Sequence, residues 1–192
     1  NFSLLPTASD TNTFLGQQYF IICSDQPNQQ YFFRRGGLTF SSYYISFGDG
    51  ADTSFSTWPQ LFGQDIIDHL YASKGVYDVK YAVELNGCWD TVHYRLFYAA
   101  APSGGISLGV GGDACVGESF DFQIDNWTSN ISPTTYYVEF GDGTDTTLYH
   151  PLTDSILTHV YRQTSCGQPN NEFIARLTVR NPCPQPRVGT IG

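Results

Sequence analysis

Methionine is absent from this chain of 192 residues, and only 14% of its residues are charged. The 9 Lys and Arg residues are outnumbered by 18 Asp and Glu residues, so the formal net charge is −9. Binding to nucleic acid needs a basic face, and we therefore expect no nucleic-acid partner. An acidic surface is compatible with solubility alone or with cation binding.

Long apolar runs are also missing. No segment approaches the roughly 20 residues that cross a bilayer as a helix, so we expect no membrane insertion. No signal peptide is visible either. Because the chain begins at Asn1 and has no Met, we expect it to be a processed piece of a longer protein, with the neighbouring domains of that protein as partners.

Motifs for catalysis are missing as well. The sequence has no Gly-x-Ser-x-Gly nucleophile elbow, and no two carboxylates stand out as a glycosidase pair. His69 and His159 each open a His-x-Tyr motif, and we interpret both as strand-end side chains that bond the backbone. A catalytic histidine would need a nucleophile beside it. We predict that the chain is not an enzyme and has no catalytic residues.

Aromatic side chains, in contrast, make up 16% of the chain and include 13 Tyr and 14 Phe. Such residues favour strands. Apolar residues alternate with others along two segments, which is typical of strands with one face in a core. They are Tyr77, Val79, Tyr81 and Val83 in the first segment, and Phe173, Ala175, Leu177 and Val179 in the second. The prediction is an all-β protein.

An internal repeat divides the chain. Segment 43–50, Tyr-Tyr-Ile-Ser-Phe-Gly-Asp-Gly, returns at 136–143 as Tyr-Tyr-Val-Glu-Phe-Gly-Asp-Gly, and both His-x-Tyr motifs follow at a similar distance. The stretch 99–105, Ala-Ala-Ala-Pro-Ser-Gly-Gly, reads as a short linker between the copies. We therefore predict two domains, 1–101 and 102–192.

These motifs resemble the PKD (polycystic kidney disease) repeat, which carries Tyr-x-x-Phe-Gly-Asp-Gly, then His-x-Tyr, then Gly-x-Tyr-x-Val, here at 75–79. The resemblance implies two tandem immunoglobulin-like (PKD) β-sandwiches. The second copy departs from the family pattern in a longer loop at 163–171. Both copies also lack the family's frequent Trp-Asp before Phe-Gly-Asp-Gly.

The cysteines near the ends of each copy are similar to those of PKD repeats in Bacteroidota surface proteins, among them adhesins and gliding-motility proteins. That resemblance implies an extracellular, cell-surface location. It also implies a non-catalytic spacer or adhesion segment that meets surface glycans or other surface proteins.

Two alternatives to a spacer stay open. One is a carbohydrate-binding accessory module of a secreted hydrolase, and the other is a building block of an extracellular filament. Trp58, Trp89 and Trp127 could form a sugar-stacking platform. Partial burial of the three under loops is the favoured interpretation.

The two Gly-Asp-Gly turns raise the question of calcium. The resemblance implies a possible Ca²⁺ site at Asp49 and Asp52, and again at Asp142 and Asp145, because carboxylates are hard oxygen ligands. The competing interpretation is that each turn aspartate only accepts hydrogen bonds from nearby backbone N–H groups. That interpretation is favoured, because the ligand spacing of an EF-hand is missing.

Five cysteines without Cys-x-x-Cys spacing favour disulfides over a zinc site. We predict the pairs Cys23–Cys88 and Cys115–Cys183, because each pair occupies corresponding places in its copy. Each loop closure would contribute on the order of 4 kcal/mol. Cys166 has no counterpart, and it could instead pair with Cys183 and leave Cys115 free.

Glycosylation is a further prediction. Thr91, Thr146 and Ser155 each follow an Asp in a pattern that resembles the O-glycosylation sites of Bacteroidota. Asparagine sequons begin at Asn126 and Asn130, and also at Asn1.

Overall fold

The chain forms two compact units, Asn1–Ala100 and Ala101–Gly192, and the predicted division lay after residue 101. A computed structural model describes residues 2–6, 11–37, 39–61, 64–109 and 115–191. Apart from one short 3₁₀ turn, η1 (Pro169–Asn171), the regular elements in these ranges are strands, which confirms the all-β prediction. In the same ranges, no helix is long and apolar enough to cross a membrane.

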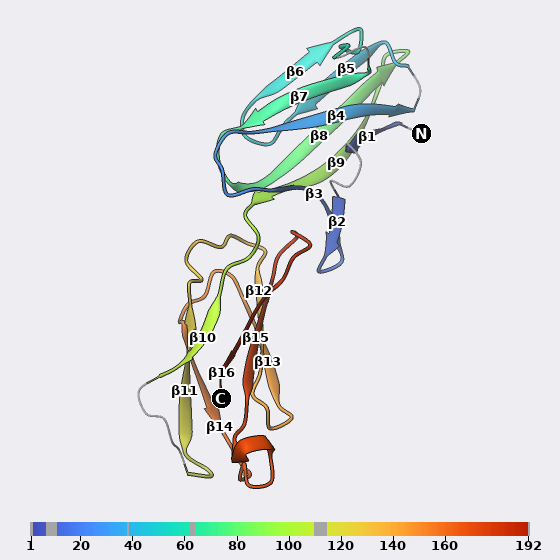
Figure 1. Cartoon of the computed structure of the whole chain (residues 1–192). Coiled ribbons are helices and arrows are strands. Elements are labelled where there is room, and N and C mark those ends of the chain that lie inside the picture. Colours follow the sequence, from blue (N-terminus) through green and yellow to red (C-terminus); the bar gives the residue numbers. More distant parts are fainter. Residues whose placement is uncertain (1, 7–10, 38, 62–63, 110–114, 192) are drawn as a thin grey trace. The chain divides into compact units, whose positions relative to one another are not determined.

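Unit 1 contains two sheets (Figure 1). The three-stranded sheet has the order β1 (Phe2–Pro6), β4 (Gln29–Gly37), β7 (Ile66–Tyr71). The six-stranded sheet has the order β2 (Thr11–Phe14), β3 (Gln17–Cys23), β9 (Cys88–Ala99), β8 (Gly75–Leu85), β5 (Ser42–Ser46), β6 (Asp52–Phe55). In this sheet β3 and β9 are parallel, whereas every other pair of neighbouring strands is antiparallel.

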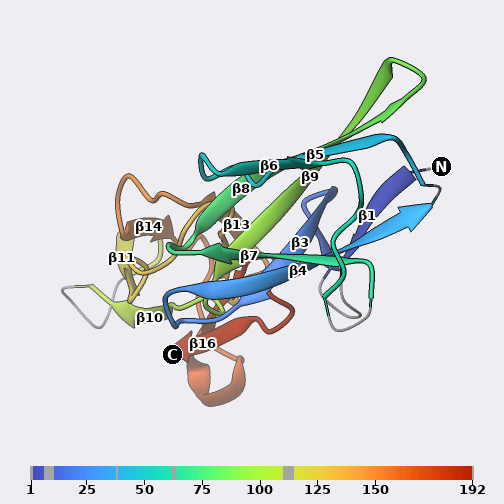
Figure 2. The ribbon, with the colours of Figure 1, turned by 90° about the horizontal axis from the view of Figure 1, so that it is seen from above.

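The core of unit 1 follows from alternation along its strands. On β5, Tyr43 and Ile45 are buried while Tyr44 between them faces outward, and on β8 Val79 and Tyr81 are fully buried around the exposed Lys80. The β8–β9 hairpin is longer than the strands beside it, and its tip extends past them (Figure 2).

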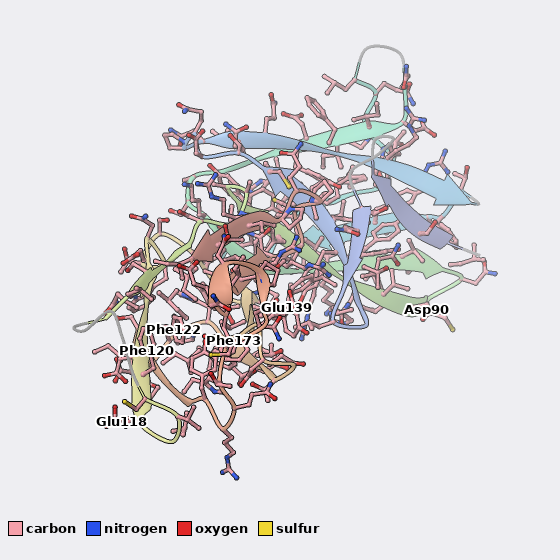
Figure 3. All side chains as sticks on the ribbon, turned by 60° about the horizontal axis from the view of Figure 1, so that its bottom comes forward. Asp90, Glu118, Phe120, Phe122, Glu139 and Phe173 are labelled. Carbon is pink, nitrogen blue, oxygen red and sulfur yellow. The ribbon has the colours of Figure 1, made fainter. Side chains whose placement is uncertain are left out.

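Unit 2 also contains two sheets. The three-stranded sheet has the order β10 (Gly105–Leu108), β11 (Ser119–Asp125), β14 (Ile156–Val160). The four-stranded sheet has the order β13 (Asp145–Tyr149), β12 (Thr135–Glu139), β15 (Ala175–Arg180), β16 (Arg187–Ile191). Phe122 on β11, labelled in Figure 3, packs into the core with Val138 and Leu177.

Both units are therefore sandwiches of the immunoglobulin-like kind, which confirms the fold prediction. In unit 2 the first, second and fifth strands form one sheet, and the third, fourth, sixth and seventh form the other. Unit 1 has the same arrangement in β1, β4, β7 and in β5, β6, β8, β9. The β2–β3 hairpin on the edge of its larger sheet is an addition.

Candidate functional site

The repeated Gly-Asp-Gly segments form tight turns from β5 to β6 and from β12 to β13. Gly48 has φ +85°, and a Cβ placed on it would lie 2.8 Å from the Asp78 backbone nitrogen. Gly141 has φ +84°, and a Cβ there would lie 2.7 Å from the Ile174 carbonyl oxygen. Only glycine satisfies both the positive φ and the close approach of backbone.

In unit 1 the turn aspartate holds a histidine from the neighbouring sheet. One carboxylate oxygen of Asp49 accepts a hydrogen bond from the Ala51 N–H at 3.1 Å. The other lies 2.7 Å from Nε2 of His69, on β7. The turn thus joins the larger sheet to the smaller one.

Two aromatic residues fix the ring of His69. It stacks on Phe47 with centroids 3.9 Å apart and planes 2° apart, and the ring of Tyr71 meets it edge-on at 4.7 Å. The Tyr71 hydroxyl donates to the Phe47 carbonyl at 3.0 Å. The interpretation of this histidine as bonding the backbone is wrong, because its ring nitrogen meets a carboxylate.

Unit 2 repeats this arrangement. Asp142 lies 2.9 Å from Nε2 of His159, whose ring stacks on Phe140 at 3.9 Å and meets Tyr161 edge-on at 4.7 Å. The Tyr161 hydroxyl donates to the Phe140 carbonyl at 3.0 Å. One difference is Thr144, whose N–H and hydroxyl both donate to Asp142, at 3.0 and 2.6 Å.

The turn aspartates of both units have a lowered pKa. Burial acts to raise the pKa of Asp49, but the hydrogen bonds from His69 and the Ala51 N–H outweigh it, so that the pKa is lowered. For Asp142, burial acts in the same sense and is outweighed by hydrogen bonds from Thr144 and His159, which lower the pKa. Burial raises the pKa of Tyr161 to about 12, with help from the Asp142 charge.

Thr144, His159 and Asp142 do not form a hydrolytic triad. In a triad the carboxylate and the hydroxyl bind different nitrogens of the ring. Here the carboxylate occupies Nε2 at 2.9 Å, and the Thr144 oxygen lies 3.5 Å from that same nitrogen while it donates to the carboxylate. The histidine is therefore not placed to take the proton of this hydroxyl.

The predicted calcium ligands divide into two kinds. Asp49 and Asp142 each use one carboxylate oxygen for a backbone N–H of the turn and the other for the histidine of the neighbouring sheet. Asp52 and Asp145 stand at the starts of β6 and β13, opposite Ser46 and Glu139. In the ranges that the structure describes, no three His, Cys, Asp or Glu side chains are grouped to hold a metal ion. Calcium binding stays a prediction.

The two predicted disulfides are absent from the structure, because Cys88 and Cys115 are free and exposed, as is Cys166. Cys23 and Cys183 are disulfide-bonded. In unit 1 the sheet register explains the error, since Cys23 lies beside Ala99, at the far end of the twelve-residue β9 from Cys88. Eleven steps of about 3.3 Å separate the two ends, whereas a disulfide needs Cα atoms within about 7 Å.

In unit 2 the predicted partners lie toward opposite ends of β12. The N–H of Gly117, close to Cys115, donates to the Tyr161 carbonyl, and the Tyr161 hydroxyl reaches the residue that follows β12. Cys183 follows the end of β15, where Arg180 pairs with the first residue of β12. The alternative pair Cys166–Cys183 is wrong too, since Cys166 is free.

The predicted O-glycosylation sites lie on strands or just before one, and their modification stays a prediction. Thr91 is exposed on β9, Thr146 is half-buried on β13, and Ser155 is half-buried and accepts a hydrogen bond from Gln123 at 2.6 Å. Asn130 is buried and its amide bonds Tyr136 and Ser103, so this sequon is a core contact. Asn1 lies outside the described residues.

The three tryptophans do not form one platform. Trp58 is buried in the core of unit 1, and Trp127 packs against the core of unit 2. Trp89 is 55% exposed and lines a groove on the outer face of the larger sheet of unit 1. Sequence reasoning missed Tyr44, Lys80 and the other lining residues, although their alternation with core positions could have placed them on this face.

Comparison with known proteins gives no family. No family model matches the chain, and no curated protein matches it. Among solved structures, the fibronectin(III)-like modules of Clostridium thermocellum CbhA are 10% identical, with a TM-score of 0.37 over 98% of this chain and 93% of that one. A two-domain fibronectin type III segment of chicken tenascin is 11% identical, with a TM-score of 0.39 over 88% and 94%. Likenesses this weak carry no argument about function.

Proposed function

We propose that the chain is a non-catalytic extracellular segment of PKD type, a spacer within a large cell-surface adhesin or motility protein. The observation that carries this proposal is the parallel pairing of β3 with β9 in unit 1. The disulfide-bonded Cys23 and Cys183 support an oxidising, extracellular location. Neighbouring domains of the same longer chain are the expected partners.

The disulfide of Cys23, at the end of β3, carries tension along the chain past β9. Once this disulfide is reduced, the same tension loads the β3–β9 pairing in shear. Residues Tyr19 to Cys23 run beside Arg95 to Ala99 in the same direction. A pull toward the N-terminus on β3 and toward the C-terminus on β9 slides the two strands in opposite directions. All of their hydrogen bonds then bear the load together, so forced unfolding, which the unfolding rate governs, is slow. Such resistance suits a spacer.

Single-molecule pulling on the whole chain, under reducing conditions that open the disulfide of Cys23, tests this proposal. The Ser24 N–H donates to the Ala99 carbonyl at 2.9 Å, so Ser24→Pro removes one bond at the end of the pairing. Ile22→Pro, two residues earlier, interrupts the pairing itself. We expect both variants to lower the unfolding force of unit 1, with the larger loss for Ile22→Pro.

The matched control is Thr13→Pro, on the edge strand β2, which leaves the β3–β9 pairing intact. Its unfolding force should equal that of the parent chain. Denaturant unfolding of each variant separates loss of folding from loss of mechanical resistance. A Ser24→Pro chain that folds normally and unfolds at the parental force would contradict the proposal.

A further inference from the structure

The outer face of the six-stranded sheet in unit 1 carries a groove with a volume of about 400 Å³. We propose that this groove binds a single pyranose ring that bears a carboxylate, as in a polysaccharide of uronic acids. The groove is lined by Tyr44, Ser54, Lys80, Ala82, Trp89 and Thr91. It lies within one unit, and the inference does not depend on the spacer function.

The strand register explains why a groove forms here. One row across the sheet contains Thr91, Ala82, Tyr44 and Ser54, on β9, β8, β5 and β6 in turn. Ala82 is the smallest side chain of the row and forms its floor. With strands about 4.8 Å apart, Thr91 and Tyr44 stand roughly 10 Å from each other across this floor, which is the width of one sugar ring with its hydroxyls.

Aromatic rings border the floor on two sides. Trp89 stands one row toward the hairpin tip, next to Asp90, which is labelled in Figure 3. Its 55% exposure leaves a large apolar ring in water, and Tyr44 is half-buried opposite it. The C–H face of a pyranose is attracted to the negative face of such rings. The hydroxyls of Ser54 and Thr91 are available to the sugar's own hydroxyls.

The charge of the groove selects an acidic sugar. Lys80 is the one charged residue among the six that line it. Its ammonium lies 5.7 Å from the centroid of the Tyr44 ring. No carboxylate in the described part of the chain forms an ion pair with it. Glu84, the outward residue of β8 that follows Ala82, accepts hydrogen bonds from the Ser41 hydroxyl and the Gly87 N–H, one on each carboxylate oxygen.

Unit 2 offers a natural control, because the corresponding row of residues there keeps the tyrosine but lacks the alanine floor. Tyr137 corresponds to Tyr44, but Thr178 replaces the alanine floor and Val188 replaces Thr91. The strand β16 begins at Arg187, opposite Val179, so it does not reach the row of unit 2 that corresponds to the row of Trp89 in unit 1. Both aromatic walls and an open floor therefore occur together in unit 1.

Calorimetric titration of the whole chain with tetragalacturonate, and with its neutral galactose counterpart, tests the proposal. We expect the acidic oligosaccharide to bind with a Kd near 1 mM and to quench the Trp89 fluorescence. Trp89→Ala should weaken binding at least about tenfold. Lys80→Gln should weaken binding of the acidic sugar about fivefold and leave the neutral one unchanged.

Ala82→Thr is the sharpest variant, because it copies the floor of unit 2 and keeps both rings. It should abolish binding at an unchanged melting temperature, and Tyr137→Ala in unit 2 should leave binding unchanged. The protein is used with an intact mass free of sugar, since a glycan on Thr91 would cover the groove. Absence of binding at 10-fold above the expected Kd, equal binding of the neutral sugar, or binding that survives Ala82→Thr would overturn the proposal.

Discussion

The two units share the geometry of the Gly-Asp-Gly turn and its histidine, and they differ on the outer faces of their larger sheets. The distance between histidine and aspartate is 2.7 Å in unit 1 and 2.9 Å in unit 2, and both histidines stack on phenylalanine at 3.9 Å. The outer faces of the larger sheets differ, since only one has an alanine floor beside an exposed tryptophan. The repeated turn stabilises each sandwich, whereas the groove of unit 1 is the proposed binding surface.

The largest expected effect comes from the first glycine of each turn. Gly48→Ala and Gly141→Ala each add a Cβ within 3 Å of another segment's backbone at a positive φ. Each should lower the free energy of unfolding of its unit by about 3 kcal/mol or more, as measured by denaturant unfolding. A cost below about 1 kcal/mol in either unit would break the equivalence of the turns.

The second turn glycine is the control for this experiment. Gly50 and Gly143 have φ values of +96° and +91°, and nothing lies within 4 Å of a Cβ on either. Substitution of either glycine by alanine should lower the free energy of unfolding by only about 1 kcal/mol, which is the cost of a positive φ for a residue with a Cβ.

The next effect distinguishes the units. His69→Ala and His159→Ala each remove a stacked ring and a hydrogen bond to an aspartate, at a cost of about 2 kcal/mol. The loss should be smaller in unit 2, because the Thr144 hydroxyl still donates to Asp142. Adding Thr144→Ala to His159→Ala should remove that advantage, and an equal loss in both single variants would show that this hydroxyl contributes nothing.

The smallest expected effect is on the pH dependence of stability. The folded-state pKa values of Asp49 and Asp142 are lowered from the ordinary 3.8. The stability that these carboxylates contribute is therefore fully present above pH 3.8 or so and is lost as pH falls through the lower folded value. Asp49→Asn and Asp142→Asn should each make the melting temperature of their unit less dependent on pH between about 2 and 4. An unchanged slope in both variants would contradict the lowered pKa values.

Much of the fold could be predicted from the sequence, because it is local or periodic. Alternation along β8 and β15 identified core faces, and the Gly-Asp-Gly turn with its His-x-Tyr partner marked both sandwiches. The β2–β3 hairpin was missed, since a parallel neighbour such as β9 leaves no sign in the spacing of residues.

The predicted sites fared less well, because they depend on register. Corresponding sequence positions suggested disulfide partners, but Cys88 begins β9, whereas Cys23, on β3, lies beside the other end of β9. The groove was missed for a similar reason. Its floor exists only because Ala82 is paired with Tyr44 on one side and Thr91 on the other, and pairing is not written in any single segment.

Each turn is locked by residues that all come from its own unit. The glycine, the aspartate, the histidine and both aromatic residues lie within one stretch of about 25 residues, 47–71 in unit 1 and 140–161 in unit 2. A duplicated gene segment would carry the whole lock with it. Copies could therefore be added or deleted during evolution, or by an engineer, to set the length of the parent protein, while individual copies remain free to acquire or lose a surface such as the Ala82 groove.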